Sequence, residues 1–400
     1  MAKSKIIAGL DIGTSNIKIL LGEKKKDERE IKVIYQAQEP SFGIRRGVVV
    51  DVEKVSRLIQ LLVNKVKIES GQRVDWVYVN IGGGHIFCNN SEGVVAVSRA
   101  DRKVSEEDVD RVLQAARTIS LSSNEEILEV IPKEFILDGK GGIKEVEGMQ
   151  GGRLEVKVLI VGCFGPYKNN LTQAVLNADL KISDMTPSIL AVASAALSQK
   201  QKESGVAVLN IGAGTSELAV FEEGNLVHLA VFPIGSANIT NDIAIILKTD
   251  IDIAESIKIR SGSCLFKGSD KKEKIELEDG EILTFSPKMV AGIIEARVSE
   301  IFGEVNKELK KIGKQGKLPA GIVLTGGGAN LPKIVDLAKK ELKLSCRTWK
   351  PSGFSNLEDG LIFTTACGLV SRGAEDLVSG KKAPGRMMER IKKAFQVFIP

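Results

Sequence analysis

The chain has 400 residues, of which 43% are hydrophobic and 27% are charged, and this is long enough for two or more domains. Its many Leu, Ile and Val residues and its net charge of only +5 exclude wholesale disorder. No uncharged apolar stretch reaches the roughly 18 residues of a membrane span, and Asp11 interrupts the N-terminal apolar run too early for a secretory signal. Five scattered cysteines without a C-x-x-C pair argue against a disulfide framework or a zinc site.

All of the excess positive charge lies at the C-terminal end. Residues 381–400 hold six basic side chains and one acidic side chain, whereas the first 380 residues hold 50 of each. The body of the protein therefore lacks the basic excess that nucleic-acid binding requires, and aromatic residues for base stacking make up only 4%. We expect no nucleic-acid partner.

Apolar, β-branched segments alternate with helical patterns along the chain. Strands are expected at 5–22, 32–38, 76–81, 205–221, 226–233 and 321–326, and helices at 52–68, 105–119, 167–178, 187–199 and 332–342. This interleaving predicts an α/β protein. Ser105 is a good N-cap, because acidic residues as far as Asp108 follow it at the positive end of the helix dipole.

One segment occurs twice. Residues 10–21 and residues 209–221 each contain an apolar strand, a turn of glycine and small hydroxyl residues, and a second apolar strand. The repeat predicts two lobes, each of which presents one hairpin to a common cleft.

Both turns have the composition of a phosphate site, because successive backbone N–H groups in a glycine-containing turn converge on an anion. The candidate residues are Gly13, Thr14, Ser15 and Asn16 in the first turn and Gly212, Ala213, Gly214 and Thr215 in the second. Asp11 is a candidate ligand of Mg²⁺ through water. Taken singly, either segment could be an ordinary hairpin; a dinucleotide-binding loop is excluded because a strand, not a helix, follows the glycines.

A third element strengthens the nucleotide interpretation. An apolar strand at 320–325 runs into Gly326, Gly327 and Gly328, and a helix is expected from about Pro332. Glycines allow a flat ring to lie against the backbone, and a helix start favours negative charge. A plain strand–helix turn is the alternative for this element alone.

In this order the three elements resemble the phosphate-1, phosphate-2 and adenosine motifs of the superfamily of actin, hexokinase and the heat-shock chaperones. Within it, the chain is most similar to the FtsA family of bacterial cell-division proteins, from about Ile6 to Leu369. The segments that carry the resemblance are 47–51, 77–84, 92–98, 104–113, 126–132, 148–156 and 251–260.

The resemblance implies a two-lobed, actin-like α/β fold of the duplicated ribonuclease-H type. Domain 1A would combine 1–81, 165–204 and 352–383, and 82–164 would be the inserted 1C subdomain, an SHS2-like interaction module. Domain 2A would combine 205–235 and 302–351, domain 2B would be 236–301, and 386–400 would be an amphipathic membrane-targeting helix.

The resemblance also implies a function. A protein of this family would bind ATP with Mg²⁺, assemble with itself in a nucleotide-dependent way, and tether FtsZ filaments to the cytoplasmic face of the inner membrane at the division site. Glu255 and Lys258 match the helix that contacts adenine and ribose, although a solvated ion pair is the alternative. Arg297 matches a basic position for the FtsZ C-terminal tail, and 82–164 would bind later division proteins.

Two departures from active relatives concern hydrolysis. Asn210 stands where phosphate 2 usually begins with an aspartate, and Thr186 precedes Pro187 where related chaperones carry a glutamate. Fewer carboxylates to organise metal and water predict a weak ATPase at most, with no confident catalytic residue. A small-molecule kinase of the same fold and a scaffold like the pilus-assembly protein PilM are the alternatives.

The basic C-terminal segment is amphipathic when it is drawn as a helix. The apolar side includes Met387, Met388, Ile391, Phe395 and Phe398, and the opposite side includes Arg390, Lys392 and Lys393. This pattern predicts a helix that lies on an anionic membrane surface. A helix docked on the protein itself or on a partner is the alternative.

Overall fold

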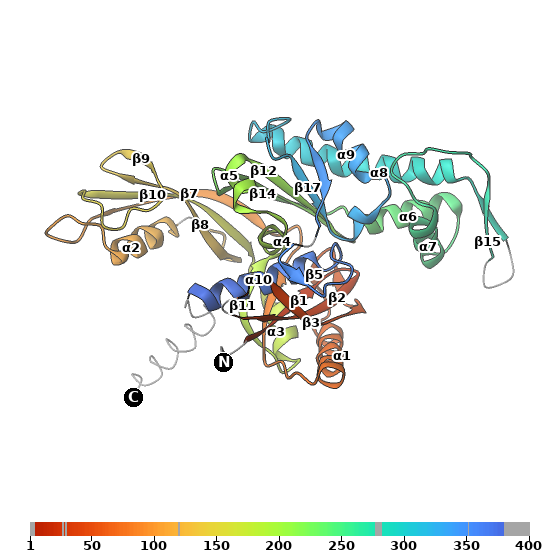
Figure 1. Cartoon of the computed structure of the whole chain (residues 1–400), viewed down its shortest axis with the longest axis horizontal. Helices are drawn as coiled ribbons and strands as arrows, with labels where there is room; N and C mark the ends of the chain where they lie inside the picture. The colour runs from red at the N-terminus through yellow and green to blue at the C-terminus, as the bar shows by residue number, and fades with distance from the viewer. Residues whose placement is uncertain are drawn as a thin grey trace.

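The computed structural model describes residues 5–25, 28, 30–118, 121–276, 282–350 and 352–379. The chain forms two lobes, each built on a mixed sheet, and a module that projects to one side (Figure 1). The expected α/β, two-lobed fold is confirmed. The membrane-targeting helix expected at 386–400 lies outside the described residues.

The lower lobe in Figure 1 contains a six-stranded sheet of order β11-β6-β1-β2-β3-β19. Its strands are β1 (Lys5–Ile12), β2 (Asn16–Lys24), β3 (Ile31–Pro40), β6 (Trp76–Ile81), β11 (Lys181–Pro187) and β19 (Phe354–Ser355). A small hairpin, β4 (Ile44–Arg45) and β5 (Val48–Val49), follows β3. The helices are α1 (Val52–Ser70), α3 (Gly165–Leu176), α4 (Ser188–Ala196) and α10 (Thr364–Ser379). Helix α5 (Gln199–Ser204) follows α4 in the chain but lies beside the upper lobe (Figure 1).

The upper lobe repeats this plan around a five-stranded sheet of order β14-β13-β12-β17-β18. In both lobes an antiparallel hairpin (β1–β2, β12–β13) has a parallel strand (β6, β17) beside its first member. The strands are β12 (Val206–Ile211), β13 (Ser216–Glu222), β14 (Asn225–Phe232), β17 (Ile322–Thr325), β18 (Cys346–Thr348), and the separate pair β15 (Glu273–Glu276) and β16 (Ile282–Phe285). The helices are α6 (Ser236–Leu247), α7 (Ile251–Ser261), α8 (Pro287–Lys311), the short 3₁₀ helix η1 (Gly327–Asn330) and α9 (Ile334–Leu342).

The projecting module has its own four-stranded sheet and its own core. The sheet order is β7-β10-β8-β9, and its elements are β7 (Phe87–Ala96), α2 (Glu106–Ala116), β8 (Glu125–Leu137), β9 (Lys140–Ile143) and β10 (Arg153–Phe164). Val112, Leu154 and Ile160 are fully buried in a cluster that is separate from the cores of the lobes. The module meets the upper lobe through polar contacts, including Asn225 Nδ2 donating to the Lys133 carbonyl over 3.0 Å.

The expected helices differ from the structure by a few residues at their ends, and in two of them the cause is local. The pattern at 187–199 predicts one helix, but α4 ends at Ala196 and α5 begins at Gln199. Ser198 interrupts the helix because its side chain caps α5 in a capping box with Gln201. The helix expected from Pro332 begins at Ile334, because the preceding glycines form η1.

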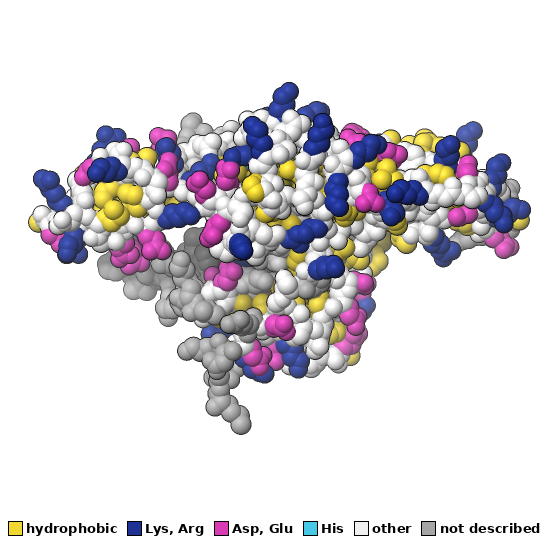
Figure 2. Space-filling view, turned by 45° about the horizontal axis from the view of Figure 1, so that its top comes forward, with side chains coloured by type: hydrophobic (Ala, Val, Ile, Leu, Met, Phe, Trp, Pro, Cys, Tyr) yellow, Lys and Arg dark blue, Asp and Glu magenta, His cyan; other side chains and the backbone are white. Residues whose placement is uncertain are grey.

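The surface carries both signs of charge. Lys and Arg side chains are interspersed with Asp and Glu side chains on the face shown in Figure 2, as expected for a body with balanced charge. Within the described ranges, no helix is long and apolar enough to cross a membrane.

At the start of α2, the buried carboxylate of Asp108 forms hydrogen bonds that connect parts of the projecting module. Asp108 is fully buried and accepts hydrogen bonds from the backbone N–H groups of Ser98 and Ser105, each over 3.0 Å. The Ser105 hydroxyl and the Arg111 guanidinium also donate to it. Burial alone would raise the pKa of Asp108, but these donors outweigh it and hold that pKa well below its usual range.

We expect Asp108→Ala to lower the free energy of unfolding by about 2–4 kcal/mol, because four donors would lose their buried acceptor. The exposed Asp110 on the same helix provides the control, since Asp110→Ala removes a charge but no buried partner. Urea unfolding measures the free energy of unfolding of both variants. The Asp108 contribution is present at neutral pH and is lost as the pH falls below the ordinary aspartate pKa of about 3.9. Equal midpoints for the two variants would contradict this role.

Candidate functional site

A cleft of about 450 Å³ lies between the lobes, within the range of ligand sites. The structure brings the three sequence elements together there. The predicted residues that line it are Asp11, Gly13, Thr14, Ser15, Asn16, Gly212, Ala213, Thr215, Glu255, Lys258, Gly326, Gly327 and Gly328. Of the predicted phosphate and nucleotide residues, only Gly214 is not part of this lining.

The two glycine turns approach each other from opposite lobes. Each is closed by a backbone hydrogen bond, from Gly13 N to Asn16 O over 3.2 Å and from Gly212 N to Thr215 O over 2.9 Å. Gly214 packs against the opposite turn, where a Cβ atom would lie 2.8 Å from Thr14 Oγ1. The contribution of Gly214 is therefore a contact between the lobes, which requires the absence of a side chain.

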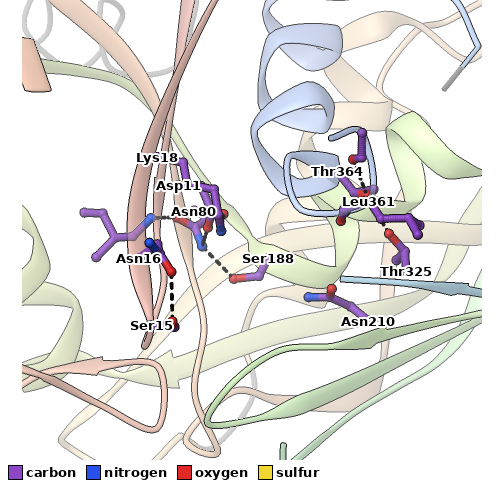
Figure 3. Close-up of polar contacts among 12 residues, drawn as sticks. Asp11, Ser15, Asn16, Lys18, Asn80, Ser188, Asn210, Thr325, Leu361 and Thr364 are labelled. Carbon is purple, nitrogen blue, oxygen red and sulfur yellow. Dashed lines mark hydrogen bonds and ion pairs between the residues drawn. The ribbon is translucent and has the colours of Figure 1, made fainter. Parts of the chain in front are cut away.

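Asp11 belongs to a hydrogen-bonded cluster on the lower lobe's side of the cleft (Figure 3). Asn80 Nδ2 donates to Asp11 Oδ1 over 2.9 Å and to Ser188 Oγ over 3.0 Å. Asn80 Oδ1 accepts from the Ile12 N–H, which fixes the orientation of the amide. Lys18 Nζ lies 3.0 Å from Asp11 Oδ2. Lys18 was not among the sequence candidates, although it lies on the strand that follows the first turn.

Asp11 suits a hydrated Mg²⁺ ion better than a fully protein-coordinated metal. No group of three or more His, Cys, Asp or Glu side chains in the described part of the chain could hold a metal ion. Mg²⁺ usually keeps several waters and binds one or two carboxylates together with phosphate oxygens. The buried Asp11 carboxylate beside the glycine turns fits that pattern.

In the pair of Lys258 and Glu255, the lysine is buried, whereas the Glu255 side chain is 42% exposed. Lys258 on α7 is only 7% exposed, and its Nζ lies 2.6 Å from Glu255 Oε2. The ammonium also donates to the Thr240 hydroxyl over 2.9 Å and to the Ser236 carbonyl over 3.3 Å. A buried lysine with acceptors from α6 and α7 is held in one position at the edge of the cleft.

The glycine segment after β17 packs tightly on β12. Gly326 has a φ of +85°, and a Cβ atom there would lie 2.5 Å from Asn210 Oδ1. Gly327, in contrast, has no atom within 4 Å of a built Cβ. Beyond the glycines, Leu331 and Pro332 add apolar surface to the cleft.

Glu217 is a cleft residue that the sequence reasoning missed. It lies on β13 and is 3% exposed, and Asn210 Nδ2 donates to its Oε2 over 3.1 Å. Burial, with a smaller contribution from the charge of Asp11, outweighs the Asn210 hydrogen bond and raises the pKa of Glu217 to about 7. The available signal was a charged residue inside an otherwise apolar strand.

Thr186, in contrast, does not contact the cleft. It is buried on β11, and its hydroxyl donates to Asp184 Oδ2 over 3.0 Å. Asp11 and Glu217 are cleft-lining carboxylates on strands that flank the phosphate turns, one from each lobe.

Arg297 lies at a second hollow, between α6 and α8. Its Nε and Nη2 atoms donate to both carboxylate oxygens of Asp242, over 2.8 and 2.9 Å, and this pairing raises the pKa of Arg297. The hollow has a volume of about 340 Å³, and Ile245 and Ile246 beside it are 73% and 51% exposed. We call this hollow, lined by Asp242, Ile245, Ile246, Ile293, Ala296, Arg297 and Glu300, the α6–α8 groove. The predicted membrane-binding residues from Met387 to Phe398 lie outside the described residues.

Replacing Gly326 with alanine tests how tightly this side of the cleft is packed. The positive φ and the 2.5 Å approach to Asn210 Oδ1 predict a loss of about 2–4 kcal/mol in the free energy of unfolding of the ligand-free protein. Gly327→Ala is the matched control and should change stability by less than about 0.5 kcal/mol. Thermal unfolding measures the stability of both variants. Equal stability would show that a side chain can be placed at Gly326 without strain.

Two family models match the chain. "Cell division protein FtsA" matches residues 207–368, and "SHS2 domain inserted in FTSA" matches residues 83–162, the projecting module. The chain is 35% identical to the cell division protein FtsA of Pseudomonas aeruginosa, with 98% of both chains covered. It is 34% identical to the cell division protein FtsA of Bacillus subtilis, with 97% of this chain and 88% of that protein covered.

Solved structures share the fold at low sequence identity. A PilM–PilN type IV pilus biogenesis complex matches with a TM-score of 0.67 at 17% identity, covering 92% of this chain and 98% of that one. MreB5 of Spiroplasma citri bound to ADP matches with a TM-score of 0.58 at 12% identity, covering 94% and 98%. The resemblance inferred from the motifs is thus confirmed along nearly the whole chain, and the protein belongs to the FtsA family of cell division proteins.

Proposed function

We propose that this protein binds Mg·ATP in the cleft between its lobes and uses it to control conformation and self-assembly. The observation that carries the proposal is the convergence of two glycine turns from opposite lobes on one cleft. Their backbone N–H groups would bind the phosphates, and Asp11 would bind the hydrated metal, which would neutralise phosphate charge. The structural relative MreB5 was solved with ADP, which supports a nucleotide in this fold.

The base of the nucleotide would lie at the glycine segment. Gly327 leaves open space for a flat ring, while Leu331 and Pro332 provide apolar surface. Glu255 would accept a hydrogen bond from the ribose, and Lys258 would exchange one of its present acceptors for an acceptor on the base or ribose. Because both are already held by α6 and α7, little side-chain entropy would be lost on binding.

We further propose that the protein tethers FtsZ filaments to the cytoplasmic face of the inner membrane at the division site. Membership of the FtsA family supports the role in division. The amphipathic sequence at 386–399 supports membrane binding, since α10 ends at Ser379 and all the excess charge of the chain follows it. The α6–α8 groove, with Arg297 at its side, would bind the FtsZ C-terminal tail, and the projecting module would contact later division proteins.

The two alternative functions have less support. A small-molecule kinase would require a second substrate site beside the terminal phosphate, and Asn210 and Thr186 replace carboxylates expected in active relatives. A pilus scaffold is favoured only by the fold likeness to the PilM complex at 17% identity, whereas the sequence relatives are division proteins.

Deleting residues 386–400 should abolish sedimentation with liposomes that contain anionic lipid. Each basic residue near such a surface contributes about 1 kcal/mol, and the apolar side adds burial. The full chain should pellet with anionic vesicles, carry FtsZ with it, and stay in solution with neutral vesicles. Lys392→Glu/Lys393→Glu is a milder variant that should weaken binding at low salt. If the truncated chain pellets as well as the full chain, the tail is not the anchor.

Ile246→Glu should weaken binding of an FtsZ C-terminal tail peptide by about tenfold or more, because it places a charge in the α6–α8 groove. The side chain is 51% exposed, so the substitution should not disturb folding. Ile68→Glu on α1 is the matched control, since Ile68 is 81% exposed and distant in sequence from the groove. Fluorescence anisotropy with a labelled peptide measures both, and equal weakening by the two variants would place the peptide elsewhere.

A further inference from the structure

A buried carboxylate in the cleft has no role in the proposed binding of nucleotide. Glu217 occupies a strand position between the buried Ser216 and Leu218, where an apolar side chain would avoid the desolvation cost of a carboxylate. Strongly perturbed acids in clefts are often functional groups.

The position of Glu217 follows from the second phosphate turn. Thr215, the last residue of that turn, directly precedes β13 and is two residues before Glu217. Both side chains line the cleft. A terminal phosphate bound at the turn would therefore have the Glu217 carboxylate beside it.

One carboxylate oxygen of Glu217 accepts a hydrogen bond from Asn210, and the other accepts none from the described residues. Asn210 is the cross-strand neighbour of Glu217, and its Nδ2 donates to Oε2 over 3.1 Å. No residue in the described ranges donates to Oε1. That oxygen lies near Gly82 of the lower lobe, where a Cβ atom would be 3.1 Å from Oε1 and 2.8 Å from Ser188 Oγ. Because Gly82 is a glycine, the Glu217 carboxylate can approach the other lobe without meeting a side chain there.

Burial is the main cause that raises the pKa of Glu217, and the groups around this part of the cleft add smaller contributions. Asp11 on β1 opposes a second negative charge, while Lys18 on β2 is already paired with Asp11. Asn210 on β12 favours the ionised form through its hydrogen bond. A carboxylate whose pKa is about 7 can accept a proton near neutral pH more readily than an ordinary glutamate.

The geometry points to Glu217 as the catalytic base of a slow nucleoside-triphosphate hydrolysis in this cleft, an inference that rests on the proposed nucleotide function. Oε1 would accept a proton from a water molecule as the water oxygen bonds to the γ-phosphorus. The bond from that phosphorus to the bridging oxygen breaks, and the diphosphate leaves with the electron pair. The proton on Glu217 then passes to phosphate or solvent, which restores the carboxylate. Glu217 would thus supply a carboxylate beside the attacking water, although positions 186 and 210 lack the carboxylates that active relatives carry.

The test is single-turnover hydrolysis of Mg·ATP by the full-length protein, compared with Glu217→Gln. The amide keeps the size and a polar partner for Asn210 but cannot accept the proton. We expect the hydrolysis rate to fall about 100-fold, with ATP affinity measured by equilibrium dialysis changed less than threefold. Glu222→Gln is the matched control, because Glu222 ends the same strand and pairs with Lys314 outside the cleft. An unchanged rate in Glu217→Gln overturns the inference.

The pH dependence separates a base from a merely structural residue. The wild-type rate should rise with pH, reach half its maximum near pH 7 and level off above it, because only the ionised carboxylate accepts a proton. Asn210→Ala should move that midpoint to higher pH, since it removes the donor that favours the ionised form. A hydrolysis rate that does not change with pH would overturn the role of Glu217 but not the proposed binding of nucleotide. The same conclusion would follow if bound ATP stayed intact on long incubation. Failure of ATP to bind would overturn the proposed function as well.

Discussion

The approach of the two glycine turns is the constraint on which the rest of the site depends. Gly214 of the upper lobe lies against Thr14 of the lower lobe, at a distance that leaves no room for a Cβ atom. The Thr14 hydroxyl is held in turn by the Gly47 N–H over 2.8 Å. Because this contact joins the lobes, it fixes the width of the cleft and the separation of the two rows of backbone donors that face it.

Polar groups around the cleft are buried and largely satisfied, as a preorganised site requires. Asp11, Asn80 and Ser188 form one hydrogen-bonded cluster in the lower lobe, and Lys258 is surrounded by acceptors from α6 and α7. Burial of such groups costs free energy unless each finds a partner. The protein bears this cost where the lobes meet, while the three buried clusters that form its cores consist of hydrophobic side chains, most of them aliphatic.

Sequence patterns predicted the parts of the fold and site that depend on local spacing. The duplicated hairpin, the glycine segment after β17 and the N-cap at Ser105 each follow from neighbours in the chain, and so did the two-lobed fold. The patterns did not show that Gly214 contacts the opposite turn or that Lys258 is buried, because both depend on elements far apart in sequence. Glu217 was missed because its importance comes from desolvation and from Asp11 across the cleft.

The most direct test of this account is titration calorimetry with Mg·ATP on the full-length protein and on Gly214→Val. The account predicts one site per chain in the wild type and at least tenfold weaker binding in the variant, since a branched side chain would push Thr14 and its turn away. Gly327 and the Lys258 pair would be unaltered in that variant, so the loss would report on the approach of the turns alone. Absence of binding to the wild type, or equal affinity for both proteins, would contradict it.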